Sequence, residues 1–120
     1  MQRKILLISR HAPYGSSTAR EALDAALAAA VYEQELSLLF MDDGVFQLLE
    51  NQQALNIDQK NLSSILGALP FYDIEKIYIH QESLEQRQIE KEDLLMESAT
   101  ILTNEQTSAL LSHQDHILSF

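Results

Sequence analysis

The sequence has 120 residues, 46% of them hydrophobic and 22% charged, which predicts one folded domain over residues 1–120 rather than a disordered chain. Its formal net charge of −10, with only 8 lysines and arginines, argues against direct binding to nucleic acid or to anionic membranes, because cations provide most of that affinity. The sequence contains no cysteine, which excludes disulfides, thiolate metal sites and covalent sulfur chemistry on this chain.

The first third of the sequence predicts a strand, a helix and a second strand. Lys4 to Ser9 is a nearly continuous apolar run, typical of a strand buried on both faces. This run is too short for a membrane span, and no small-residue cleavage pattern follows it before His11, so we expect a cytoplasmic protein without a signal peptide. A capping box at Thr18–Glu21 predicts the start of an alanine-rich helix with its body from Ala22 to Tyr32, and Leu36 to Met41 is the second predicted strand.

The middle of the sequence predicts two helices and a third strand. A short helix is expected through Val45–Leu49, followed by a loop from Asn51 to Ile57. Asp58 is a good N-cap for a helix that runs to about Ala68 and ends at Pro70. The third strand is predicted at Ile74–Ile79.

The last third predicts short elements. A helix from Glu82 to Gln88 is followed by a solvated charged stretch and by a short strand at Leu94–Met96. A second capping box at Thr103–Gln106 predicts a helix to about Leu111, and Asp115–Phe120 predicts a last short strand or tail. The alternation of strands and helices predicts an α/β fold, a three-layer α/β/α sandwich with a mostly parallel sheet of about five strands, whose order the sequence does not determine.

The most prominent candidate site residue is His80, at the carboxyl end of the third predicted strand. Ligands and reactive groups gather at that edge in open α/β proteins, so His80 is a candidate general base, proton donor or anion-binding donor. The alternative is a structural histidine at the edge of the sheet or in an interface. Ser83 lies three residues on and could face His80, but no glycine-flanked elbow surrounds it, so a Ser–His hydrolase is not favoured.

Three further groups of polar residues have an ordinary structural interpretation. Asp42 and Asp43 follow a strand and could hold Mg²⁺ or act as acid and base, but they are equally typical of a helix cap. His113 and His116 are three residues apart, but we expect them to diverge where a helix gives way to a strand, so a metal site is not predicted. The loop from His11 to Ser17 could bind an anion, but it carries no glycine-rich nucleotide motif. No cofactor is predicted.

Apolar residues near loops are candidates for an interface if several of them share one surface. These are Phe46, Leu48, Leu49, Phe71, Tyr72 and Phe120.

The stretch Phe40–Leu49, FMDDGVFQLL, resembles the DGVFQLL signature of the TusC/DsrF subunits in the DsrE/DsrF-like family. Other matching stretches occur in order along the chain, so that the resemblance covers nearly all of it. They are Ala12–Gly15, Arg20–Ala25, Leu69–Glu75, Ser83 and Leu84 with Arg87, and Ile117–Phe120.

The resemblance implies a DsrE/F-like sandwich and a cytoplasmic bacterial complex built from TusB-like, TusC-like and TusD-like subunits as a dimer of heterotrimers. That complex receives persulfide sulfur from TusA and passes it to TusE, for 2-thiouridine formation at the tRNA wobble position. In the TusD-type subunit the sulfur-carrying cysteine stands at the end of the third strand, where this sequence has His80. Because imidazole cannot carry sulfane sulfur, we expect a non-catalytic subunit.

The expected interface residues of such a subunit are Tyr14, Asp42, Phe46, Phe71, Tyr72, His80 and Phe120. Two alternatives remain. One is a DsrF-like subunit in dissimilatory sulfur oxidation, and the other is a small α/β enzyme that uses His80 with Asp42 or Asp43.

Overall fold

The computed structural model describes residues 3–13, 17–30, 35–49, 65–72, 74–94 and 98–120. Five strands form one sheet in the order β4-β3-β2-β1-β5, and every pair of neighbouring strands is parallel. The strands are β1 (Lys4–Ser9), β2 (Glu35–Phe40), β3 (Lys76–His80), β4 (Thr100–Leu102) and β5 (His116–Ser119). The helical elements are α1 (Thr18–Ala30), η1 (Asp42–Leu48), η2 (Leu69–Tyr72), α3 (Gln81–Gln86), η3 (Lys91–Asp93) and α4 (Asn104–Ser112).

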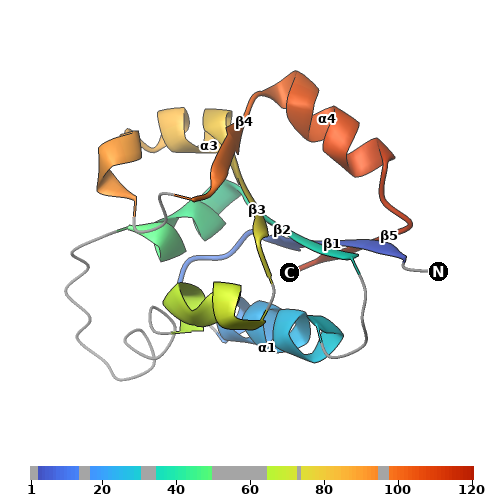
Figure 1. Ribbon diagram of the computed structural model, residues 1–120. Helices are drawn as coiled ribbons and strands as arrows, with labels where there is room; N and C mark the ends of the chain where they lie inside the picture. Colours follow the sequence, from blue (N-terminus) through green and yellow to red (C-terminus); the bar gives the residue numbers. More distant parts are fainter. Residues whose placement is uncertain (1–2, 14–16, 31–34, 50–64, 73, 95–97) are drawn as a thin grey trace.

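The sheet lies between two helical layers, as the sequence predicted (Figure 1). α1 and the helical segment 65–72 cover one face, and α3 and α4 lie over the other face (Figure 1). The short helix η1 leaves the end of β2 and packs against α3. Among the described residues, no helix has both the length and the apolar character needed to cross a membrane.

The two faces of the sheet carry cores of very different size. On the α1 face, side chains such as Leu38, Phe40 and Ile79 belong to the large cluster, and Ala22 and Ala26 of α1 are buried against them. Each fully buried large apolar side chain contributes about 1.5–3 kcal/mol, and alanine lets the helix backbone approach the sheet closely. The cluster on the α4 face is smaller, and its buried members are Leu6, Ile8 and Leu39.

The predicted capping boxes had different outcomes. At α4 the box is confirmed: the Thr103 hydroxyl accepts the Gln106 N–H at 3.2 Å, and the Gln106 side chain accepts the Thr103 N–H at 2.9 Å. At α1 the helix already includes Thr18, which leaves Ser17 before it, and the Ser17 hydroxyl donates to the Glu21 carboxylate at 3.1 Å. The predicted helix start is therefore confirmed, and the capping box at Thr18–Glu21 stays a prediction.

The sequence analysis did not predict the fourth strand of the sheet, β4, which the structure has at Thr100–Leu102. Of the short strand predicted at Leu94–Met96, only Leu94 is described, and it makes an isolated antiparallel bridge to Leu49. β4 is short and apolar and is followed directly by the cap of α4. The predicted loop Asn51–Ile57, the N-cap Asp58 and residues 95–97 lie outside the described residues.

Candidate functional site

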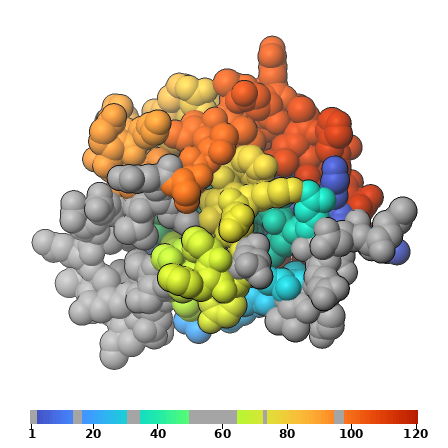
Figure 2. Space-filling view, viewed as in Figure 1, coloured from blue at the N-terminus to red at the C-terminus, as the bar shows by residue number. Residues whose placement is uncertain are grey.

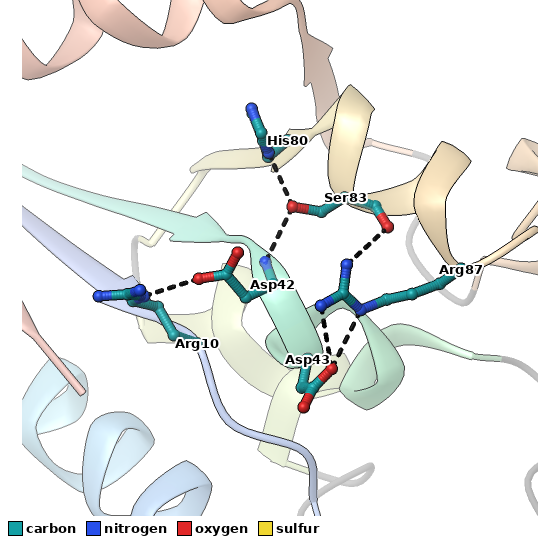
Figure 3. Close-up of polar contacts among 6 residues, drawn as sticks. All are labelled: Arg10, Asp42, Asp43, His80, Ser83 and Arg87. Carbon is teal, nitrogen blue, oxygen red and sulfur yellow. Dashed lines mark hydrogen bonds and ion pairs between the residues drawn. The ribbon is translucent and has the colours of Figure 1, made fainter.

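The carboxyl ends of all five strands meet at one edge of the sheet because the strands are parallel. His80 ends β3, and Asp42 and Asp43 follow β2, the strand beside it. Arg10 follows β1 on the other side of β2. The fold therefore brings together the histidine and both carboxylates that the sequence analysis selected (Figure 3).

His80 is part of a continuous chain of hydrogen bonds. Glu82 is an acceptor, so the amide nitrogen of Asn104 faces it at 2.8 Å and donates. The Asn104 oxygen then faces the His80 Nε2 at 2.6 Å, which requires a proton on Nε2. In the neutral imidazole, Nδ1 is then an acceptor for the Ser83 hydroxyl at 2.7 Å, and Ser83 in turn accepts the Asp42 backbone N–H at 2.8 Å (Figure 3).

These hydrogen bonds hold Ser83 in a buried position and do not present it as an exposed nucleophile. Ser83 is 1% exposed, so its hydroxyl cannot contact a substrate unless α3 moves. The bond from the Asp42 N–H also holds the backbone of Asp42, whose φ of 51° is rare for a residue other than glycine. Ser83 does face His80 as the spacing suggested, and the pair ties β2, β3 and α3 together.

The carboxylates of Asp42 and Asp43 form ion pairs with arginines and do not contact the His80 imidazole. The Asp42 carboxylate accepts from Arg10 Nε at 2.8 Å, and the Asp43 carboxylate lies 3.0 Å from an Arg87 nitrogen (Figure 3). Arg87 also lies 6.0 Å from the centre of the Phe46 ring, within range of a cation–π contact. The enzyme alternative requires His80 and an aspartate carboxylate to face one pocket. In the structure, His80 is linked only to the backbone of Asp42, through Ser83, and both carboxylates form ion pairs with arginines.

The histidines near the C-terminus are separated. His113 caps the end of α4, with its Nδ1 2.6 Å from the Ala109 carbonyl, and His116 begins β5 and contacts Arg3. No group of three metal-ligating side chains is found among the described residues. The two histidines diverge, as the predicted change from helix to strand implied.

Two residues that shape this edge were not singled out as site residues. Gln47 is 1% exposed, and its amide nitrogen donates to the Ser9 hydroxyl at 2.7 Å and to the His11 carbonyl at 2.9 Å. A Cβ at Gly44 would lie 2.0 Å from the Ser9 carbonyl oxygen, so η1 can lie against the end of β1 only with glycine there. Both residues belong to the stretch DDGVFQLL, and this family-like motif was the feature of the sequence that could have identified them.

Of the predicted interface residues, Asp42 and His80 lie together at the carboxyl edge, whereas the other described ones are distributed over several elements. Phe71 and Tyr72 of η2 are 89% and 53% exposed, whereas Phe120 packs partly against the main core. Phe46 lies beside Arg87, and Tyr14 is outside the described residues. Their role in an interface stays a prediction.

Comparison with known proteins places this geometry in a family. A family model described as the DsrE/DsrF-like family matches residues 3–120. The chain belongs to the DsrE/DsrF-like family. A TusC homolog from Pseudomonas aeruginosa is 34% identical over 119 residues, with 99% of each chain covered, and one from Vibrio vulnificus is 38% identical over 117 residues, with 98% of each chain covered.

Other relatives agree with this DsrE/DsrF-like assignment. The intracellular sulfur oxidation protein DsrF of Allochromatium vinosum is 33% identical over 131 aligned positions, covering 98% of this chain and 96% of that protein. The crystal structure of the ychN protein from E. coli has a TM-score of 0.78 and 25% identity, with both chains covered completely. The predicted family and the α/β fold with its parallel sheet are confirmed, and the names of the relatives support membership of a sulfur-relay family.

Proposed function

We propose that this protein is a non-catalytic subunit of a cytoplasmic sulfur-relay complex of the TusBCD type. In this proposal it assembles with TusB-like and TusD-like subunits into a hetero-hexamer. The complex passes persulfide sulfur from TusA to TusE for 2-thiouridine formation at the tRNA wobble position. The chain itself provides binding surfaces and does not hold the sulfur.

The observation that carries the proposal is the absence of cysteine from the sequence, together with a histidine held by hydrogen bonds at the end of β3. A persulfide requires a thiolate, and the sequence has no cysteine. The side chain at the relevant position is His80, and both of its ring nitrogens are occupied, by Ser83 and by Asn104. A histidine held in this way has neither the sulfur atom nor the free lone pair that a relay would need.

The second candidate is a DsrF-like subunit in dissimilatory sulfur oxidation. It is favoured by the 33% identity to a DsrF protein that is itself named for intracellular sulfur oxidation. Both candidates agree with this fold and with a sequence that contains no cysteine. They differ in which complex the chain joins, so they are separated by its partners and not by its own chemistry.

The test has a covalent arm and a cellular arm. The purified protein is incubated with a persulfide-loaded TusA-type donor carrying labelled sulfane sulfur, and we expect no covalent transfer to this chain. The variant His80→Cys is the matched positive control, because it places a thiol at this position that can accept the labelled sulfur. Uptake of label by the unaltered chain would overturn the proposal.

In cells, deletion of this subunit should abolish 2-thiouridine at the wobble position, and co-expression with TusB-like and TusD-like subunits should give one assembly by native mass. His80→Ala should retain the modification, since His80 carries no sulfur in this proposal. If deletion leaves 2-thiouridine unchanged and the protein co-purifies with sulfur-oxidation proteins instead, the DsrF-like alternative is favoured.

A further inference from the structure

A second polar site lies at the opposite edge of the sheet from His80. A cleft of about 370 Å³ opens between α4 and the amino ends of β1, β2 and β3. In Figure 2 the teal and yellow atoms of β2 and β3 come to the surface beneath the red atoms of α4. The volume falls in the range of about 300–1,000 Å³ that is usual for small-molecule sites.

The lining of this cleft carries two lysines and one carboxylate, in a chain with a formal net charge of −10. The Asp115 carboxylate also lies nearby and accepts the Lys4 backbone N–H at 2.7 Å. Lys4, Glu35 and Lys76, the first residues of three neighbouring strands, all line the cleft. Lys76 donates to the Glu35 carboxylate, whereas Lys4 has no ion-pair partner among the described residues. Two ammonium groups therefore meet one carboxylate. The hydrogen bond from Lys76 holds the pKa of Glu35 below its usual value, and the charge of Lys4 adds to that effect.

The cleft also contains polar groups without partners. Ser37 is 4% exposed and lines the cleft, yet its hydroxyl makes no hydrogen bond within the described part of the chain. Just beyond the end of α4, the Gln114 amide oxygen is buried and accepts no hydrogen bond from the residues that the structure describes. The Ser37 hydroxyl is open to the cleft and can bond with water or a ligand. For the buried Gln114 oxygen, the lack of a hydrogen bond costs about 1–3 kcal/mol, and such groups are normally satisfied by water or by a ligand.

The remaining lining suits the same kind of molecule. Besides the charged residues, the cleft is lined by Tyr78 and by the apolar side chains of Leu102 and Leu110. His113 also lines the cleft, and because its Nδ1 faces the Ala109 carbonyl, its Nε2 is the nitrogen left for other contacts. A charged floor, hydroxyl groups and a small apolar wall favour a molecule with a short carbon chain and one anionic group.

We propose that this cleft binds a small organic anion, a phosphate ester or carboxylate that also carries a hydroxyl group. The anionic group lies between Lys4 and Lys76, and the hydroxyl of the ligand bonds with Ser37. Although Leu102 of the lining pairs with His80, Lys4, Glu35 and Lys76 lie at the opposite edge of the sheet from His80. The proposal therefore does not depend on the sulfur-relay assignment.

Three probes with the same carbon skeleton test it: glycerol 3-phosphate, glycerate and neutral glycerol. Binding is measured by saturation-transfer NMR and calorimetry on the full chain, co-purified with its partner subunits if it is not soluble alone. We expect one or both anions to bind and glycerol not to bind. Which anion binds more tightly identifies the headgroup.

Three variants locate the binding. Lys4→Gln should weaken it about three- to tenfold, as expected for one partly solvated charge contact. Ser37→Ala should also weaken it, without lowering the melting temperature, because the hydroxyl loses no bond within the protein. Lys91→Gln on η3 removes the same charge outside the cleft lining and should leave affinity unchanged.

Three results would overturn the proposal. The first is the absence of binding by either anion up to about 10 mM. The second is equal binding of glycerol. The third is anion binding that Lys4→Gln and Ser37→Ala leave unchanged, or that Lys91→Gln weakens as much as they do.

Discussion

Removal of the Ser83 hydroxyl tests the hydrogen-bond chain at the carboxyl edge. Ser83→Ala leaves the Asp42 N–H without its acceptor at 2.8 Å and the His80 Nδ1 without its donor at 2.7 Å. An unsatisfied buried donor costs about 1–3 kcal/mol, and the half-buried imidazole can recruit water and adds less. Because Asp42 also has a φ of 51°, loss of this bond removes a contact that holds a strained backbone.

We therefore expect Ser83→Ala to destabilise the domain by about 2–3 kcal/mol, which for 120 residues corresponds to a fall in melting temperature of about 7–12 °C. The assay is denaturant and thermal unfolding followed by circular dichroism, with ¹⁵N NMR of the imidazole to report the tautomer of His80. Ser112→Ala is the matched control, since that hydroxyl is exposed and bonds only locally. A loss below about 0.5 kcal/mol, the size usual for surface changes, would refute the reasoning.

Three other changes have expected outcomes. Gly44→Ala should cost about 2–4 kcal/mol in unfolding experiments because its Cβ would lie 2.0 Å from a backbone oxygen, whereas Gly67→Ala, with nothing within 4 Å, should be neutral or slightly stabilising; equal effects would contradict the packing argument. Glu35 has its pKa lowered by Lys76, so its stabilising contribution is full above pH 4.5, the usual pKa, and is lost as pH falls through the lowered pKa. Lys76→Gln should remove that part of the acid dependence in pH-resolved melts, and an unchanged profile would argue against the pair. Phe71→Ser should change stability by less than about 0.5 kcal/mol because the ring is 89% exposed, yet weaken assembly measured by native mass if η2 is an interface.

Much of the fold could be predicted because individual segments carry strong local signals. β1 was predicted with the correct bounds, since Lys4–Ser9 is a continuous apolar run. α4 was predicted at its capping box, in which two reciprocal hydrogen bonds lie within four residues. β4 was not predicted because a strand of three residues has no period of its own and is defined by pairing with β3.

The site was harder to predict than the fold because its contacts join distant segments. The bond between His80 and Asn104 spans 24 residues, and that between Asp42 and Ser83 spans 41. These contacts depend on β2 lying beside β3 and on α4 starting next to β4, and the order of strands is not written in any local pattern. The sequence located His80, Ser83 and Asp42 singly, but only the folded chain shows how they are linked.

The unequal cores on the two faces of the sheet have a consequence for motion. α1 buries four of its side chains, including Leu23, whereas Thr107 is the buried residue of α4. Segments with little buried apolar surface open locally at a lower free energy than the whole domain. The amides of α4 should therefore exchange with solvent deuterium by an opening that leaves α1 and the central strands protected. Each such opening of α4 would expose the cleft lined by Lys4 and Lys76 to solvent.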